Sequence, residues 1–188
     1  HLLHTGGLDP EKDLNIIDLP GAKERNVSFG VFAAEALTNG LIDGYWSNAM
    51  GAETAVSRGV GKIHIDVRRG DDPDKVRHST CAGLAVTDDF IMRQPGSVDA
   101  AVRAIVKAQR MLKLEPSLAS KVGANLFPSE AADLISAIVS RDTPFYDPAI
   151  SAITVQRINA FAQSVGQLSG PVPYEHVIAE RCIPIWNS

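Results

Sequence analysis

Apolar residues follow two different spacings in the first third of the chain. Some segments alternate apolar and polar positions, which is the pattern of a half-buried strand, and between them apolar residues recur three and four positions apart, which is the pattern of a helix. The predicted strands are 13–19, 41–46 and 62–67, and the predicted helices are 33–38 and 53–58. Strands that alternate with helices at this spacing are typical of βαβ units, which have right-handed connections. We therefore predict a parallel sheet in residues 1–75.

A polar stretch, RRGDDPDKVRHS at residues 68–79, separates this part from the rest of the chain. It contains glycine, proline and charges of both signs and offers almost nothing to a core. We place a domain boundary inside it, with residues 1–75 in one lobe and 76–188 in the other. The second part begins with one strand at 80–87 and is helical afterwards. Its predicted helices begin at Asp88, Ser97, Ser129, Asp147-Pro148 and near Pro173.

One strand followed by several amphipathic helices cannot cover both faces of a sheet. The partner strands are therefore expected to precede His1, and the chain, which does not begin with methionine, is expected to be a processed or truncated piece. Such a piece exposes an apolar sheet edge, so we also expect the chain to self-associate.

Composition describes a globular protein and excludes several classes of function. Of 188 residues, 45% are hydrophobic and 21% are charged, and the net charge is −4, which gives no positive field for binding nucleic acid. No apolar run is long enough to cross a bilayer. Cys81 and Cys182 lie far apart without a CxxC motif, which excludes a cysteine-rich zinc module and leaves either one disulfide or two buried thiols.

No catalytic or cofactor motif is present. The five histidines form no HExxH motif and stand in no recognisable relation to a nucleophile such as that of GxSxG. The glycines between residues 40 and 61 spell neither GxGxxG nor GxxxxGK[ST]. We therefore predict no catalytic residue, no metal and no cofactor.

Loops that follow the predicted strands are the best candidates for a binding site, because ligands of open α/β sheets collect at the carboxyl ends of the strands. The loop at 20–30 leads into a helix whose free N–H groups can hold an anionic head group, which Lys23 and Arg25 could balance. Tyr45-Trp46-Ser47-Asn48 places aromatic rings beside two short hydrogen-bonding side chains, as in pockets for small organic ligands. The alternative is that these rings belong to the core and that Ser47-Asn48 caps the next helix.

A third candidate is the predicted loop at 141–147, which holds two adjacent aromatic residues, Phe145 and Tyr146. No helical pattern requires these rings, so they can form an aromatic lid. The alternative is a hydrophobic staple around the predicted cap at Asp147.

The order of several short motifs resembles a known family. Leu8-Asp9-Pro10 precedes a strand that ends in Pro20, and Glu35-Ala36-Leu37 leads through Gly40-Leu41-Ile42-Asp43-Gly44 to an aromatic residue at a strand end. Later, Ala85-Val86-Thr87-Asp88-Asp89-Phe90 precedes Pro95 and a long helix. This arrangement resembles the periplasmic substrate-binding proteins of ABC transporters, in the group that serves nitrate, sulfonates, taurine and pyrimidine precursors of thiamine.

The resemblance implies a fold and a function. The fold is α/β of the type II periplasmic-binding class, with one complete lobe and the returning, mostly helical part of a second lobe. The function is capture of a small organic or oxyanionic solute (a sulfonate, carboxylate, nitrate or pyrimidine-like molecule) in a cleft between the lobes, in the periplasm, for delivery to an ABC permease in the inner membrane. No enzymatic activity is implied. The ligand-binding residues on this mapping are Asn26, Ser28, Phe29, Trp46, Ser47, Asn48, Thr80, Phe145 and Tyr146.

Two other functions remain open at this point. The same scaffold can carry an enzyme similar to a thiamine-pyrimidine synthase, or it can be the effector-binding domain of a regulator, because fold does not dictate function. The native upstream sequence distinguishes them: a signal peptide supports transport, and a helix-turn-helix supports regulation.

Overall fold

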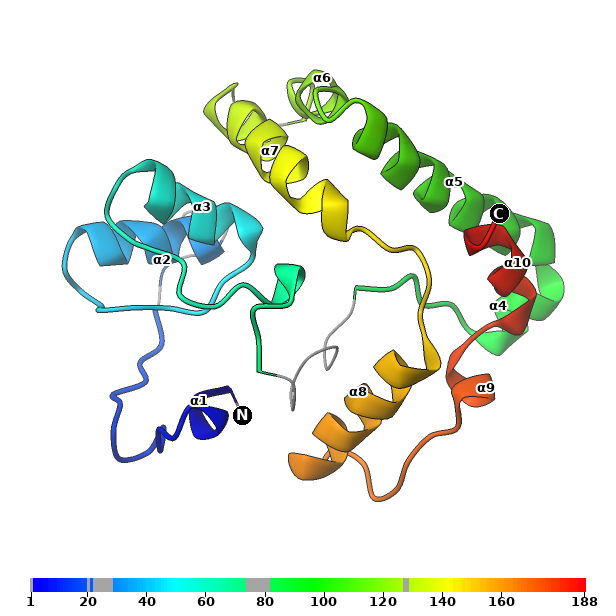
Figure 1. Cartoon of the computed structure of the whole chain (residues 1–188), viewed down its shortest axis with the longest axis horizontal. Helices are drawn as coiled ribbons and strands as arrows, with labels where there is room; N and C mark the ends of the chain where they lie inside the picture. The colour runs from blue at the N-terminus through cyan, green and yellow to red at the C-terminus, as the bar shows by residue number, and fades with distance from the viewer. Residues whose placement is uncertain (1, 20, 22–28, 74–81, 127–128) are drawn as a thin grey trace. The chain divides into compact units, whose positions relative to one another are not determined.

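The computed structural model describes residues 2–19, 21, 29–73, 82–126 and 129–188, and these residues form helices joined by extended and irregular segments (Figure 1). The helices and 3₁₀ turns in chain order are α1 (Leu2–Thr5), α2 (Phe29–Thr38), α3 (Ala49–Ser57), η1 (Val67–Arg69), α4 (Asp88–Arg93), α5 (Pro95–Leu114), α6 (Leu118–Gly123), α7 (Ser129–Asp142), η2 (Thr143–Phe145), α8 (Ala152–Ser164), α9 (Tyr174–Val177), η3 (Glu180–Cys182) and α10 (Ile183–Trp186).

The predicted α/β fold is wrong for the described residues, which contain helices and no strand. The described parts of 13–19, 41–46, 62–67 and 80–87 contain no strand, and no ladder of backbone hydrogen bonds joins them. Alternating apolar residues give a segment a face to bury, but a strand exists only when a neighbour satisfies its N–H and C=O groups. In the described structure these segments have no such neighbour.

Most helix predictions are confirmed. The predicted helices at 33–38 and 53–58 lie in α2 and α3, and α3 ends at Ser57. Helix α4 begins at Asp88 with Thr87 as its cap, and α5 begins at Pro95, two residues before the predicted start at Ser97. Helices α7 and α9 begin at Ser129 and Tyr174, at or beside the predicted positions. The glycine stops are confirmed as well: Gly40 and Gly59 have positive φ angles of 67° and 69°. Beyond them Leu41 N–H donates to Ala36 O at 2.9 Å and Val60 N–H donates to Ala55 O at 3.0 Å, the pattern that ends a helix in a left-handed residue.

The predicted helix start at Asp147-Pro148 is wrong. The carboxylate of Asp147 accepts a hydrogen bond from Ala149 N–H at 2.9 Å and so closes a local turn instead of capping a helix. Helix α8 begins later, and its cap is Ser151, whose hydroxyl accepts from Thr154 N–H at 3.2 Å. Ser151, three residues before Thr154, thus makes the cap that was expected from Asp147.

The chain divides into two compact units. The first unit consists of His1–Asp66 and Glu115–Asp142, and the second consists of Val67–Leu114 and Thr143–Ser188. The predicted division into two lobes at residues 75 and 76 stays a prediction.

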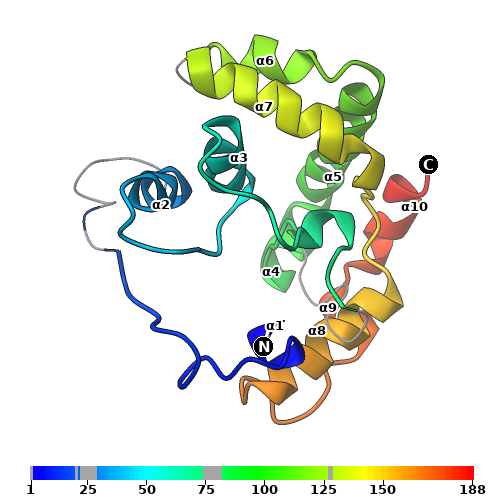
Figure 2. The same ribbon diagram turned by 60° about the vertical axis from the view of Figure 1, so that its left-hand side comes forward.

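Helix packing in the first unit centres on α3, which contacts both α2 and α7. Helix α7 in turn lies beside α6, as Figure 2 also shows. The buried residues between α2 and α3 are mostly small, and they include Ala33, Ala34, Ala36 and Ala55. Small residues let two helices approach more closely than the usual interaxial distance of about 8–10 Å.

In the second unit, hydrogen bonds to loop carbonyls fix the segments around α8 and α9. The amide of Asn159 is buried and exchanges two hydrogen bonds with the backbone of Val172, at 2.7 and 2.9 Å. The hydroxyl of Tyr174 donates to Ile150 O at 2.9 Å. These contacts tie the segment before α9 to the middle of α8, and the start of α9 to the residues before α8.

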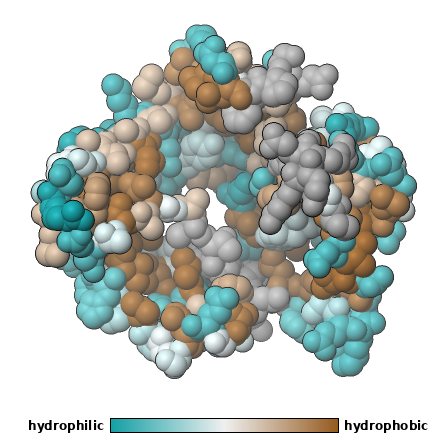
Figure 3. Space-filling model, turned by 180° about the vertical axis from the view of Figure 1, so that it is seen from behind, coloured by the Kyte–Doolittle hydropathy of each residue, from teal (hydrophilic) through white to brown (hydrophobic). Residues whose placement is uncertain are grey.

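Extended segments of both units expose apolar side chains. Ile16 is 71% exposed and Leu41 is 67% exposed in the first unit, and Leu84 and Val86 are exposed in the second. Hydrophobic residues reach the surface at several places on the face shown in Figure 3. Apolar surface of this kind is favourable to bury against another molecule.

The close approach of α2 and α3 predicts the effect of one added methyl group. A Cβ at Gly51 would lie 2.5 Å from Gly30 Cα, a distance at which the helices must separate. Gly51→Ala is therefore expected to lower the free energy of unfolding by about 1–3 kcal/mol, although alanine is the better helix former by about 1 kcal/mol. In Gly96→Ala, the control in α5, the added Cβ meets nothing within 4 Å, and that variant is expected to be as stable as the wild type or more stable. Urea denaturation measures both, and equal stability of the two variants would contradict the close packing.

The exposed apolar segments predict self-association. Sedimentation velocity over about a hundredfold range of protein concentration is expected to show a weight-average mass that rises with concentration. Ile16→Asp and Leu84→Asp place charges on exposed positions and are expected to shift the distribution toward the monomer. A single monomeric species at every concentration would refute this expectation.

Candidate functional site

Four of the residues predicted to bind ligand lie at the beginnings of α2 and α3. Phe29 is the first residue of α2, and Trp46, Ser47 and Asn48 immediately precede α3. The two first turns contact each other: a Cβ at Gly30 would meet Asn48 Oδ1 at 2.8 Å and Gly51 Cα at 2.9 Å. The packing of α2 on α3 thus brings residues from two separate loops to one place.

The contact depends on two glycines, one in each helix. Gly30 and Gly51 face each other, and a side chain on either would also collide with Ser47 Oγ. That hydroxyl is buried and has no hydrogen-bond partner in the described structure. A buried polar group without a hydrogen-bond partner lowers the stability of the folded chain, so the position of the Ser47 hydroxyl needs an explanation. We name the cluster of Phe29, Gly30, Trp46, Ser47, Asn48 and Gly51 the α2–α3 site.

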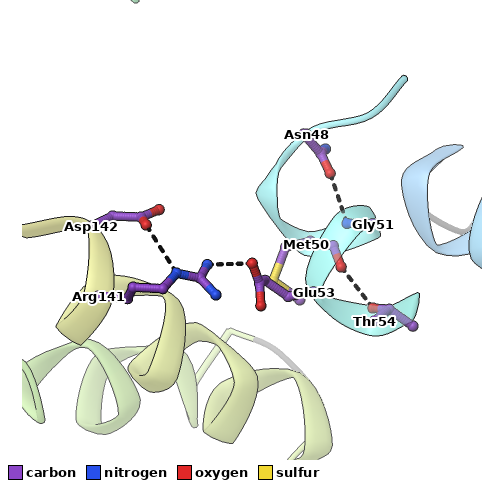
Figure 4. Close-up of polar contacts among 7 residues, drawn as sticks. All are labelled: Asn48, Met50, Gly51, Glu53, Thr54, Arg141 and Asp142. Atoms are coloured by element: carbon purple, nitrogen blue, oxygen red, sulfur yellow. Dashed lines mark hydrogen bonds and ion pairs between the residues drawn. The ribbon is translucent and has the colours of Figure 1, made fainter. Parts of the chain in front are cut away.

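Local hydrogen bonds fix the loop before α3. Asn48 is the cap of the helix, and its Oδ1 accepts from Gly51 N–H at 3.1 Å (Figure 4). The hydroxyl of Tyr45 donates to Gly51 O at 2.8 Å, and burial raises the pKa of Tyr45 above its usual range, so it stays protonated. The alternative interpretation of Asn48 as a cap is confirmed, and Tyr45 is an anchor for this loop.

The two aromatic side chains of the α2–α3 site remain open to solvent. Phe29 is 57% exposed and Trp46 is 62% exposed. Phe29 immediately precedes Gly30, and Trp46 immediately precedes Ser47, whose hydroxyl lies beside both glycines. Large exposed rings next to a buried, unpartnered hydroxyl provide apolar surface beside a polar group, which is the usual composition of a small-molecule site.

The electrostatics of the α2–α3 site favour negative charge. The backbone dipoles of an α-helix leave partial positive charge and unpaired N–H groups at its beginning. Two helices of ten and nine residues have their first turns in contact here, so their fields add at the same place. An anion or the electronegative edge of a small molecule is stabilised at such a position.

The remaining predicted site residues fall into two groups. Asn26, Ser28 and Thr80 lie outside the described residues. Phe145 and Tyr146 belong to the second unit: Phe145 ends η2 and is exposed, and Tyr146 N–H donates to Thr143 O at 3.2 Å. The structure thus brings together Phe29, Trp46, Ser47 and Asn48.

Sequence analysis missed a buried ion pair that joins α3 to α7. The guanidinium of Arg141 lies between the carboxylates of Glu53 and Asp142, forming an ion pair with Glu53 and a hydrogen bond from Nε to Asp142 Oδ1 at 3.4 Å (Figure 4). Both carboxylates are buried. The hydrogen bond to Glu53, opposed by burial, raises the pKa of Arg141, so this residue stays charged.

The sequence contains a signal for this ion pair, but the prediction of a loop at these residues concealed it. Residues 141–147 were predicted to connect two helices, whereas α7 continues to Asp142. Ile138, Val139 and Asp142 follow one another at helical spacing and are all buried. A buried aspartate at the end of an apolar stripe indicates a partner cation, which here is its own neighbour, Arg141.

Among the described residues, no group of three or more His, Cys, Asp and Glu side chains is placed to hold a metal ion. None of the described helices combines the length and the apolar character needed to cross a bilayer. Cys182 is a free, buried thiol, and burial raises its pKa; Cys81 lies outside the described residues.

Comparison with known proteins identifies the family. The sequence profile of the NMT1-like family matches residues 1–126, about two thirds of the chain. The chain belongs to the NMT1-like family. This family is part of the type II periplasmic-binding group of nitrate, sulfonate and taurine ABC substrate-binding proteins, so the resemblance is confirmed at the level of the family. No curated protein and no solved structure matches the chain.

Membership in the NMT1-like family supports a binding protein in general terms. Members are generally substrate-binding proteins of ABC transporters and not enzymes, and such proteins typically act outside the cytoplasm. The matched range contains the whole described part of the α2–α3 site. The helical arrangement of the described residues differs from the α/β fold of this family.

The Glu53–Arg141 ion pair predicts a loss of stability when one partner is neutralised. Glu53→Gln keeps the shape but leaves the guanidinium without its buried carboxylate. The expected loss is about 1–3 kcal/mol, below the full value for a buried pair because a third of the Arg141 side chain remains exposed. The measurement is the urea midpoint at unchanged slope.

Glu115→Gln is the control for this variant, because it breaks the surface pair between Glu115 and Lys121 and is expected to leave the midpoint almost unchanged. If both glutamines reduced stability equally, a special role for the α3–α7 ion pair would be excluded.

Proposed function

We propose that this chain is the solute-binding component of an ABC transporter and that the α2–α3 site contributes the anion-binding part of its ligand site. The ligand is a small organic or oxyanionic solute: a sulfonate, a carboxylate, nitrate or a pyrimidine-like molecule. The protein acts outside the cytoplasm and delivers the solute to a membrane permease. Membership in the NMT1-like family supports the general function.

One observation supports the ligand class. The buried hydroxyl of Ser47 has no partner and lies where the beginnings of two helices meet. A hydroxyl can donate to an anionic oxygen, and the two helix ends stabilise the same negative charge. An oxyanion thus satisfies both features at once.

The exposed aromatic side chains account for the organic part of the ligand. Phe29 and Trp46 offer apolar faces beside the polar contact. A sulfonate or carboxylate with a short organic group, or a flat pyrimidine, can place its charged or polar edge near Ser47 and its apolar part against these rings. The described residues of the site are aromatic, hydroxyl and amide groups, which bind by non-covalent contacts and release their ligand unchanged, as transport requires.

A thermal-shift panel of sulfonates, carboxylates, nitrate and pyrimidines tests the proposal. A ligand at a hundred times its Kd contributes about 2.7 kcal/mol, which raises the melting temperature of a protein of this size by about 5–10 °C. Trp46→Ala is expected to reduce the shift caused by the best ligand, because the ring that contacts the solute is lost. Leu41→Ala, in which an equally exposed apolar residue of the same unit is removed, is expected to keep the full shift.

Ser47→Ala separates binding from stability. Without ligand this variant is expected to be more stable than the wild type by about 1 kcal/mol, since an unpartnered buried hydroxyl is removed. With ligand it is expected to show a smaller shift than the wild type. A variant that is more stable and binds as well as the wild type would show that Ser47 does not contact the solute, and a flat panel with the wild type would reject the ligand class.

A further inference from the structure

One face of α5, in the second unit, concentrates positive charge. Four cationic side chains project from it at spacings of three or four residues, and all four are exposed: Arg103, Lys107, Arg110 and Lys113. None of them forms an ion pair with a described residue. The whole chain has a net charge of −4, so this face opposes the charge of the rest of the protein. We name it the α5 cationic face.

The α5 cationic face borders a groove. Helix α10 packs against α5, and two adjacent hollows of about 210 and 300 Å³ lie along their contact. Val106 and Arg110 line both hollows, and Trp186 and Ile185 form the apolar wall on the side of α10. The lining contains all four cations and no aspartate or glutamate.

A bidentate ion pair fixes this arrangement. Arg181, in η3 just before α10, donates from Nε and Nη2 to the carboxylate of Asp99 at 3.0 and 2.9 Å. Asp99 lies in the first turns of α5, and its pKa is held below the usual range by this hydrogen bond. The acidic residue of α5 is thereby used to position α10. It lies one turn before Arg103, and beyond Arg103 the helix carries no further aspartate or glutamate.

The size and shape of the surface indicate the kind of molecule it can bind. From Arg103 to Lys113 the helix rises about 15 Å, so the charges are spread along a line and do not converge on one small ion. Apolar side chains lie beside them: Val106 forms the floor of the hollows and Trp186 a wall. Leu114, which follows Lys113 at the end of the helix, is 88% exposed. A line of cations beside a groove that contains apolar side chains is complementary to an amphipathic peptide segment with acidic residues at helical spacing.

We propose that the α5 cationic face and its groove are the docking surface for an acidic amphipathic segment of a partner protein. Carboxylates of the segment pair with Arg103, Lys107, Arg110 and Lys113, and its apolar side chains enter the groove beside Trp186. A lipid surface is the less suitable occupant, because the apolar groups line a hollow in which Trp186 is half buried. This proposal does not depend on the proposed solute site, which uses residues of the first unit.

Fluorescence anisotropy with a labelled synthetic helix tests the proposal. The probe carries four glutamates spaced to match the four cations and leucines on the adjoining face, and a second probe has the same composition in scrambled order. The patterned peptide is expected to bind the protein at least about tenfold more tightly than the scrambled one at low ionic strength, and to weaken as salt screens the charges.

Two lysine variants with the same charge change locate the contact. Lys107→Glu reverses an exposed charge in the groove and is expected to reduce the affinity about tenfold, whereas Lys62→Glu reverses an exposed charge in the first unit and is expected to change it less than about twofold. Circular dichroism confirms that both variants keep their helices, and Lys113→Glu replaces Lys107→Glu if the latter does not.

Four results would overturn the proposal. They are equal affinity for the patterned and scrambled peptides, equal losses in Lys107→Glu and Lys62→Glu, full displacement of the peptide by inorganic phosphate at matched ionic strength, and binding of vesicles with anionic lipids in the absence of peptide binding. The third would indicate a site for a small anion, and the fourth would indicate a membrane surface.

Discussion

The close contact of Gly30 with Gly51 is the constraint on which the first unit depends. Because neither residue has a Cβ, the first turns of α2 and α3 approach until backbone touches backbone, and the alanines that follow extend the same contact. This approach places Ser47 and Asn48 against α2 and fixes the orientation in which the two helices begin. The α2–α3 site therefore depends on these two glycines. Without their contact, the loop that carries Trp46 would have no defined place beside the start of α2.

The same contact gives the α2–α3 site its chemical character. The beginnings of two helices lie together, and the hydroxyl of Ser47 beside them has no hydrogen-bond partner in the described structure. Charge at helix ends is weak when water surrounds it, and it becomes effective where the backbone is packed and partly shielded. In the function proposed for this site, stability and binding conflict, since a buried polar group without a partner reduces stability in the absence of ligand. Such conflicts are common at functional sites.

Charged groups hold each unit together in a different way. In the first unit, Arg141 lies between two buried carboxylates and ties α7 to α3. In the second, Arg181 uses both nitrogens of its fork to bind Asp99, which orients α10 along α5. A guanidinium suits both tasks because its donors are rigid and it remains charged at every physiological pH. Apolar burial is modest in each unit, so these directional contacts determine which helix faces meet.

The sequence determined the positions of most helices and their ends, because capping residues, glycine stops and the spacing of apolar residues act locally. It also determined that Trp46, Ser47 and Asn48 lie together, since they are neighbours in the chain, and its short motifs indicated the family. Only the tertiary structure decided that the alternating segments lack strand partners, that Arg141 at the end of α7 pairs with Glu53 of α3, and that Phe29 lies beside the loop before α3. Each of these depends on contacts between residues distant in sequence, and pairing across space leaves no periodic signal within either segment alone.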